Sequence, residues 1–595
     1  MAAINTDIEN LFKDKVLGHP AGLMVLFFTE MWERFSFYGM RVLLVNFLTT
    51  AIIGANAGWG WSAENAGALF GTYAMLLYIT PVIGGVIADK LTGYRWAVVI
   101  GALIMTLGHA AMALETEFML YLGLALLVIG TGFFKPNITS IISEMYKENP
   151  EKKDGAYTIF YMGVNAGAFF GMMLCGYLAE KVGWAYGFGL AGIFMLLGTL
   201  QFWLAGSLFG NIGAKPSDKI EPEVAQGITD TDDGPTVNDI FVEPDNPFTT
   251  MDKVLMILSA VIGFGYAIND PMSKIGGIDL FSMLQIGNME GQYVAVLFAL
   301  ALFLVLVGGR ISRYTKVTRD RMIAFIIFAF FTVFFWMAFE QGASSLVLFA
   351  RDNVDRVLTG GAATTFNVIN TLLTVIPLLI ISYVLILLWK KTFSKIAGSN
   401  IVLVITFILM WGVVVWMLGR EFTAENNEIT VSWFSILNSF FIIVFATFFS
   451  KWWESKYNPS AASKYALGLI IMAIGFGLLA WGAYGVTEGV KVSMIWLILA
   501  YLFHTLGELC LSPVGLSYVS KLVPPRMIAL MFGMWYVAIA IGNKLAAVVG
   551  GQIENITEQY SLSTFFLIFT IVPLAAGLLV WALNPLMKKL MHGVK

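Results

Sequence analysis

The chain is poor in charge and almost free of cysteine. Only 13% of its 595 residues are charged and two are cysteines. Cys175 and Cys510 lie inside apolar runs, so nothing predicts a disulfide framework, a metal site or redox chemistry. The net charge of −3 excludes the strong basic excess that is typical of nucleic-acid binding. Because the sequence has no nucleophile, metal or phosphate-binding motif, we expect no enzyme, no cofactor, no metal and no nucleic-acid partner.

Apolar residues make up most of the chain instead. Hydrophobic residues account for 58% and aromatic residues for 14%, and the mean hydropathy is +0.77. This composition predicts an all-α polytopic membrane protein, because an apolar run of about twenty residues can cross a bilayer as a helix. We expect about sixteen such spans, which also makes the lipid bilayer a partner. They lie near residues 21–50, 64–88, 96–114, 118–142, 156–180, 188–209, 253–269, 291–308, 321–350, 365–388, 397–418, 430–454, 463–485, 493–519, 525–552 and 562–586.

The apolar runs stop between residues 210 and 252. Acidic residues outnumber lysines there and no apolar periodicity is present, which predicts a solvated linker. Lys and Arg concentrate in the loops at one end of the predicted spans, so the positive-inside rule places both termini in the cytoplasm. The expected order is a tail 1–20, a six-helix bundle 21–209, the linker 210–252, an inserted helix pair 253–309, a second bundle 310–588 that holds an extra pair 365–418, and a tail 589–595.

The first predicted span carries four charges at membrane depth. Glu30, Glu33, Arg34 and Arg41 fall on one helix face together with Tyr38. A charge in the hydrocarbon costs about 3 kcal/mol on insertion scales, so these side chains should face the protein interior and pair with each other. They indicate a path for ions or substrate or, as the plainer alternative, an ion-pair cluster that locks helices together.

The pattern E-x-x-E-R-F-x-x-Y-G at 30–39 resembles the first helix of the proton-dependent oligopeptide transporter (POT) family of the major facilitator superfamily. Other stretches are similar to later motifs of that family: G-T-G-F-F-K-P-N at 130–137, F-Y-M-G-V-N at 160–165, F-W-M-A-F-E-Q at 335–341 and G-E-L-C-L-S-P-V-G at 507–515. The resemblance implies the major facilitator fold, in which two six-helix bundles are joined here by inserted helix pairs. One departure is Phe37, where the family usually carries a second tyrosine.

The resemblance also implies roles for individual residues. Those implied in proton coupling are Glu30, Glu33, Arg34 and Glu340. Those implied in substrate binding are Arg41, Tyr38, Tyr78, Lys135, Asn165, Trp336, Glu340, Gln341, Asn438, Glu508 and Trp535. Those implied in conformational change are Gly85, Asp89, Arg95, Pro136 and Pro513.

The predicted charges are divided between the two halves of the chain. Arg34, Arg41 and Lys135 belong to the first half, whereas Glu340 and Glu508 belong to the second. A zwitterion between them would be oriented end to end, and loose aromatic space would tolerate its variable side chains. In the empty site we expect Arg41 and Lys135 to pair with Glu340 and Glu508.

Some assignments stay open at this point. Both Asn370 and Asn438 follow an aromatic residue at the spacing expected for the eighth core helix, and we favour Asn438 because the next helices follow it at normal spacing. Gly71 stands where mammalian relatives carry a histidine, so proton coupling should rest on carboxylates. His504 lies one turn before Glu508. We expect it to be a core residue rather than a partner that shifts the pKa of Glu508.

The function that the resemblance implies is import of di- and tripeptides by proton-coupled symport with alternating access. The alternatives are a related transporter of nitrate, a drug-like molecule or a modified peptide and, more remotely, a membrane receptor or enzyme. Mammalian members carry a large extracellular domain after the ninth core helix, whereas only a short loop separates Gly485 from Met494. We therefore expect a bacterial inner-membrane protein that works as a monomer.

Overall fold

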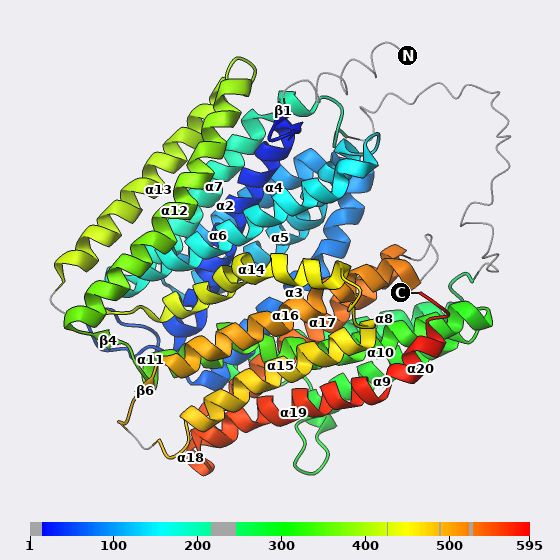
Figure 1. Cartoon of the computed structure of the whole chain (residues 1–595). Helices are drawn as coiled ribbons and strands as arrows, with labels where there is room; N and C mark the ends of the chain where they lie inside the picture. The colour runs from blue at the N-terminus through cyan, green and yellow to red at the C-terminus, as the bar shows by residue number, and fades with distance from the viewer. Residues whose placement is uncertain (1–14, 216–245, 425–426, 487–488, 523–527, 595) are drawn as a thin grey trace, which may run out of the picture.

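Long helices build almost the whole molecule (Figure 1). The computed structural model describes residues 15–215, 246–424, 427–486, 489–522 and 528–594. Sixteen of the helices in these ranges have twenty or more residues. The expected all-α membrane protein with about sixteen spans is therefore confirmed.

The first bundle is held together by the close approach of helices that carry small residues. In α6 a side chain at Gly167 would lie 2.2 Å from the carbonyl oxygen of Met31, and one at Gly171 would lie 2.2 Å from that of Phe35. Glycines four residues apart thus let α6 lie directly on α2. The helices of this bundle are α2 (Ala21–Thr49), α3 (Ala63–Ile87), α4 (Gly93–Met112), α5 (Glu117–Met145), α6 (Lys153–Lys181) and α7 (Trp184–Leu204), with η1 (Ala88–Thr92), η2 (Pro150–Lys152) and η3 (Gly206–Phe209) at their ends.

The second bundle begins with a broken helix. The single span expected at 321–350 is divided, because α10 ends at Phe339, a 3-10 turn follows, and α11 begins at Ser345. Gln341 stabilises the break by donating to the carbonyl oxygens of Met337 at 3.0 Å and Ala546 at 2.9 Å. The elements are α10 (Lys316–Phe339), η7 (Glu340–Ala343), α11 (Ser345–Asp352), α14 (Val431–Glu454), α15 (Ala461–Gly482), α16 (Ile495–Leu522), α17 (Ile528–Gly550), α18 (Ile553–Gln559), α19 (Leu562–Ala582) and α20 (Asn584–Leu590).

Two helix hairpins lie outside the bundles. The first consists of α8 (Thr250–Gly276) and α9 (Gly291–Ile311), joined through η6 (Ser282–Leu284), and α8 packs on α3. The second consists of α12 (Gly360–Thr392) and α13 (Ala397–Thr423), and α13 packs on α7 of the first bundle although it follows α11 in the chain (Figure 1). The span expected at 253–269 is longer than predicted, because a Thr249 capping box starts α8 and Gly277 ends it.

The two bundles meet along two seams. The seams are formed by α3 against α17 and by α6 against α14. We call the end of the molecule where α2 ends and α3 begins the distal end, and the opposite end, where α2 begins, the terminal end. Short strands pair at both ends: β1 (Lys15–Val16) with β2 (His19–Pro20), β3 (Val354–Asp355) with β6 (Val492–Ser493), and β4 (Val357–Leu358) with β5 (Asn427–Glu428).

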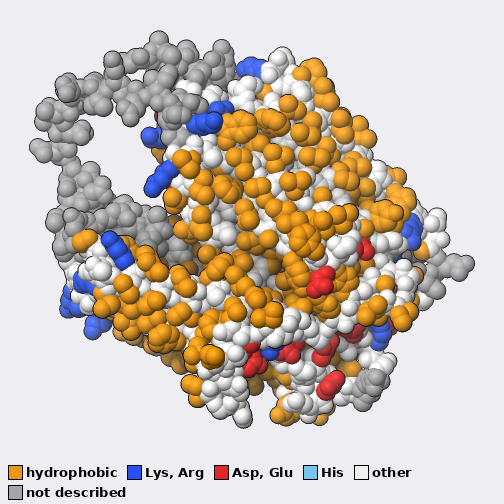
Figure 2. Space-filling model, turned by 180° about the vertical axis from the view of Figure 1, so that it is seen from behind, with side chains coloured by type: hydrophobic (Ala, Val, Ile, Leu, Met, Phe, Trp, Pro, Cys, Tyr) orange, Lys and Arg blue, Asp and Glu red, His pale blue; other side chains and the backbone are white. Residues whose placement is uncertain are grey.

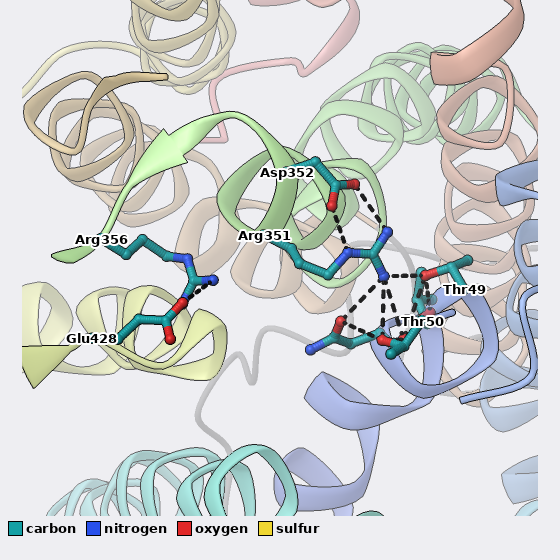
Figure 3. A network of polar contacts seen from close by, with 8 residues as sticks. Thr49, Thr50, Arg351, Asp352, Arg356 and Glu428 are labelled. Atoms are coloured by element: carbon teal, nitrogen blue, oxygen red, sulfur yellow. Dashed lines mark hydrogen bonds and ion pairs between the residues drawn. The ribbon is translucent and has the colours of Figure 1, made fainter. Parts of the chain in front are cut away.

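Polar contacts tie the bundles together at the distal end. Arg351 of α11 donates to Thr49 Oγ1 at 2.7 Å and to Asn46 Oδ1 at 3.3 Å, and its guanidinium is held in a fork by Asp352 (Figure 3). Beside it Arg356 pairs with Glu428 at 2.9 Å. Glu180 of α6 accepts from the first backbone N–H groups of α14, at 2.7 and 2.9 Å. The contacts of Arg351 and Glu180 therefore join the two bundles at the distal end.

The outer surface suits a bilayer. Hydrophobic side chains cover most of the face in Figure 2; most Lys and Arg side chains lie toward its edges, and the Asp and Glu side chains lie mainly in its lower part. Fourteen described stretches are long and apolar enough to cross a membrane, with α3 and α4 counted as one. The first helix, α2, is not among them because it carries Glu30, Glu33, Arg34 and Arg41. Those charges are turned inward, toward the space between the bundles.

Candidate functional site

A cavity of about 270 Å³ lies between the two bundles. It is lined from both sides, by α2, α3, α5 and α6 of the first bundle and by α10, η7, α14 and α16 of the second. Most of the residues predicted to bind substrate line it: Tyr38, Arg41, Tyr78, Lys135, Asn165, Trp336, Glu340, Asn438 and Glu508. Arg34, predicted for proton coupling, lines it as well.

The charged face of α2 forms a buried cluster at the cavity wall. Arg34 Nε lies 2.8 Å from Glu30 Oε1 and 2.6 Å from Glu33 Oε2. Glu33 is fully buried and Glu30 is 4% exposed, so both carboxylates stand behind Arg34, which itself faces the cavity. One guanidinium therefore separates the cavity from two carboxylates. A change at Arg34 must alter the pairing of both.

A second cation of α2 crosses between the bundles. Arg41 forms an ion pair with Glu340, which is 3% exposed, at the end of α10. The Phe37 ring lies 5.4 Å from the Arg34 guanidinium and 6.0 Å from that of Arg41. A ring between two cations offers both of them its negative face. Phe37, which stands where the family usually carries a second tyrosine, therefore contacts both arginines through its ring.

Lys135 lies on the first-bundle side of the cavity. Its ammonium sits 4.7 Å from the centre of the Tyr78 ring. The Arg41–Glu340 pair is formed as expected, but the expected pair of Lys135 with Glu508 is absent from the described contacts. The cavity itself separates the two side chains, since α5 and α16 line opposite walls.

The second-bundle wall holds Glu508 in a polar setting. Asn438 hydrogen-bonds the Glu508 carboxylate, and Asn438 Oδ1 accepts from Thr505 Oγ1 at 2.7 Å. One carboxylate oxygen of Glu508 is buried without a hydrogen-bond partner, so the group can accept a donor from the cavity. Asn370 lies elsewhere, in α12, where it accepts from Trp433 Nε1 at 3.1 Å.

Some predicted substrate residues do not line the cavity. Gln341 is fully buried and braces η7 against α17, as described above. Trp535 packs against Phe325, with ring centres 5.9 Å apart, and fills the space that a side chain at Gly515 would need. Both contribute to the packing of the second bundle. His504, by contrast, lines the cavity; it is 2% exposed and its ring lies 4.3 Å from that of Phe476.

The predicted conformational residues lie toward the terminal end. Asp89 is exposed in the π-helical turn η1. Arg95 donates to the carbonyl oxygen of Gly206 at 2.8 Å and so ties α4 to the end of α7. Pro136 lies within α5. A side chain at Gly85 would have only the Pro136 side chain near it, at 3.9 Å. Pro513 lies in α16, and its side chain falls outside the described residues.

Sequence reasoning missed several residues of the cavity wall. Tyr501 lies seven residues before Glu508 on the same helix face, and its hydroxyl donates to the carbonyl oxygen of Gly342 at 3.2 Å. Ser435 and Ser439 flank Asn438 on the cavity face of α14. The helical spacing from Glu508 and Asn438 was the available signal for all three. Tyr161, half exposed, completes the wall from α6.

Two helical bundles around a cavity with cations on one side and carboxylates on the other define the class of a major facilitator transporter. The POT family model matches residues 95–231 and 404–568. The peptide transporter YePEPT of Yersinia enterocolitica is 30% identical over 549 residues, which cover 90% of this chain and 88% of that protein. A di-/tripeptide transporter of Lactococcus lactis is 26% identical, with 99% of this chain and 100% of that protein covered.

A solved structure agrees with the sequence comparisons. The crystal structure of a peptide transporter POT in complex with sulfate is 26% identical and matches with a TM-score of 0.68, over 98% of this chain and 99% of that chain. The chain belongs to the POT family.

Proposed function

We propose that the protein is a proton-coupled symporter of di- and tripeptides. The observation that carries the proposal is the division of charge across the cavity. Arg34, Arg41 and Lys135 face it from the first bundle, and Glu340 and Glu508 face it from the second. A peptide presents a carboxylate at one end and an ammonium at the other, so it fits between these groups in one orientation.

Two features support peptides over simpler zwitterions. Asn165 and Asn438 line the cavity from opposite bundles and can bond the amide groups of a short backbone. Between them the wall is built from aromatic and small side chains, which accept side chains of different size. The relatives named peptide and di-/tripeptide transporters are consistent with this cargo.

The Arg34 cluster supports coupling to protons. Glu30 and Glu33 share one arginine, so protonation of either carboxylate changes how the guanidinium is held. Arg34 lies at the cavity wall, where bound substrate can also reach it. The same cation therefore responds to proton and to peptide, which is the linkage that symport requires.

The closed distal end supports a state that opens toward the terminal end. Basic residues favour the terminal end as the cytoplasmic one, so this state faces inward in a bacterial inner membrane with cytoplasmic termini. Rocking of the bundles would break the distal contacts of Arg351 and open the cavity to the other side. One chain contains both bundles, and the proposal therefore needs only a monomer.

The proposal is tested in proteoliposomes that contain the purified protein. An imposed inward proton gradient should drive uptake of labelled dialanine, and unlabelled tripeptides should compete with it. Lys135→Ala should nearly abolish uptake, because an ammonium that binds the substrate carboxylate is lost, whereas Lys147→Ala outside the cavity should not. Uptake that does not depend on the imposed proton gradient would reject proton coupling. Competition by nitrate or a drug-like molecule but not by peptides would assign another cargo.

A further inference from the structure

A second buried charged pair lies away from the cavity. Lys544 of α17 and Asp270 of α8 are joined by a Nζ–Oδ2 contact of 2.5 Å, and their side chains are 4% and 2% exposed. Neither lines the cavity. Charges inside a membrane protein are expensive to bury and are retained mostly where they act in function.

The Lys544 ammonium contacts two other helices at once, α3 and α8. Besides Asp270 it donates to Thr72 Oγ1 at 3.0 Å and to the carbonyl oxygen of Ala68 at 3.2 Å, both on α3. The ring of Tyr266 of α8 lies 5.7 Å away. A side chain of the second bundle is thus anchored on the first bundle and on the inserted hairpin.

The hairpin itself is fastened to the first bundle. Thr72 Oγ1 donates to the carbonyl oxygen of Ala267 at 2.6 Å, and Lys274 pairs with Glu64 at 2.5 Å. Both contacts join α8 to α3 without using α17. Asp270 therefore belongs to the part that moves with α3, and its bond to Lys544 crosses from one bundle to the other.

The seam at this level is closed by direct backbone approach. A side chain at Gly71 would lie 2.5 Å from the Ala547 side chain, and one at Gly67 would lie 2.7 Å from the Ala547 carbonyl oxygen. Separation of α3 from α17 at the distal end must therefore remove Lys544 from Thr72, Ala68 and Asp270 together.

We propose that Asp270 and Lys544 are a positioning pair that holds the distal seam closed, and that the α8–α9 hairpin contributes to the transport cycle by supplying Asp270. The pair adds a charged contact that the closed state has and the distally open state lacks, so it sets the balance between the two. The proposal assumes two-state rocking of the bundles but not a particular cargo, and its test needs no substrate.

The test measures the opening of the distal end directly. Spin labels are attached at Ile53→Cys, which is 91% exposed in the loop between α2 and α3, and at Glu558→Cys on the exposed face of α18. Pulsed electron paramagnetic resonance then gives the distribution of distances between the two labels, and so between the bundles, in nanodiscs. Both native cysteines are buried, so the label should react only at the introduced cysteines. Asp270→Asn and Lys544→Gln are each expected to raise the ratio of long to short distances about tenfold.

Two further variants keep the test decisive. The double variant Asp270→Asn with Lys544→Gln buries no unpaired charge, so it should fold and still show the shift. The exchange of both charges, Asp270→Lys with Lys544→Asp, should restore part of the short-distance population. Lys274→Gln is the matched control, because it breaks a contact of α8 with α3 and should leave the distribution unchanged. An unchanged distribution in the folded double variant, or an equal shift in Lys274→Gln, would overturn the proposal.

Discussion

At the scale of single residues, the Arg34 cluster shows how the chain places charge in a membrane. Both carboxylates reach the same nitrogen, Nε of Arg34, at 2.8 and 2.6 Å. Glu33 and one oxygen of Glu30 have no other hydrogen-bond partner among the described residues. The cluster therefore stays satisfied only while the charge of Arg34 is in place, and a proton on either carboxylate weakens its hold.

This arrangement leads to a prediction about coupling. Glu30→Gln and Glu33→Gln each fix one member of the cluster in a neutral form, so uptake driven by a proton gradient should disappear. Exchange of peptide for peptide across the membrane needs no net proton release, and counterflow should survive in the same protein. Glu117→Gln, an exposed carboxylate on α5, is the control and should keep driven uptake. Gradient-driven uptake in both cluster variants would move the coupling to Glu340 or Glu508.

Phe37 leads to a second prediction at this scale. Its ring interacts with the guanidinium groups of Arg34 and Arg41, and a cation–π contact contributes about 0.5–2 kcal/mol. Phe37→Ala should therefore weaken peptide binding about tenfold, whereas Phe37→Tyr keeps the ring and should bind at least as well as the wild type. Binding of dialanine by calorimetry measures both. Equal affinity in Phe37→Ala would show that the ring contributes nothing to the placement of the two cations.

At the scale of helices, α3 and α5 meet where a proline has changed the backbone. Pro136 has no N–H, so the carbonyl oxygen of Gly132 four residues earlier loses its helical partner. That oxygen faces α3 directly, since a side chain at Gly84 would lie only 2.0 Å from it. The next residue, Gly85, has nothing nearer than the Pro136 side chain at 3.9 Å.

The pair of glycines gives a matched test of packing. Gly84→Ala places a methyl group against backbone that cannot move aside, and overpacking of this kind costs about 1–3 kcal/mol. Gly85→Ala fills open space and should be neutral or slightly stabilising, because alanine favours the helix. Thermal unfolding in detergent should show a lower midpoint for Gly84→Ala alone. Equal midpoints would mean that α3 and α5 are free to separate.

The same helices show what the sequence can and cannot predict. Apolar runs and the positive-inside pattern located the helices, and motif spacing placed Arg34, Arg41 and Glu340 at one cavity. Gln341 and Trp535 lie in the same motifs but point into helix contacts instead, because a linear pattern does not tell which side of a buried helix faces a cavity. The break of α10 at Glu340 was missed because the apolar run continues through α11.

At the scale of the whole molecule, the position of a helix in the chain does not always tell which bundle it packs against. The α12–α13 hairpin is inserted in the second half of the sequence, yet it packs along the first bundle (Figure 1). Phe407 of α13 contacts Trp32 and Phe28 of α2, each with ring centres 5.6 Å apart. Toward the distal end Tyr177 of α6 donates to Glu421 at 2.5 Å. No sequence pattern indicated this, because contacts between distant segments leave no local periodicity.

The last prediction follows from that packing. Aromatic contacts and a polar contact fasten α13 to α2 and α6, so the hairpin should move with the first bundle when the two bundles rock. Spin labels are placed at Ile408→Cys on α13 and Ile193→Cys on α7, both exposed. The distance between these two labels should not change when a saturating peptide is added or the pH is changed. Labels at Ile408→Cys and at Ile571→Cys on α19, also exposed, should show a shift. If the first distance changes and the second does not, the hairpin instead belongs mechanically to the second bundle, from which its chain emerges.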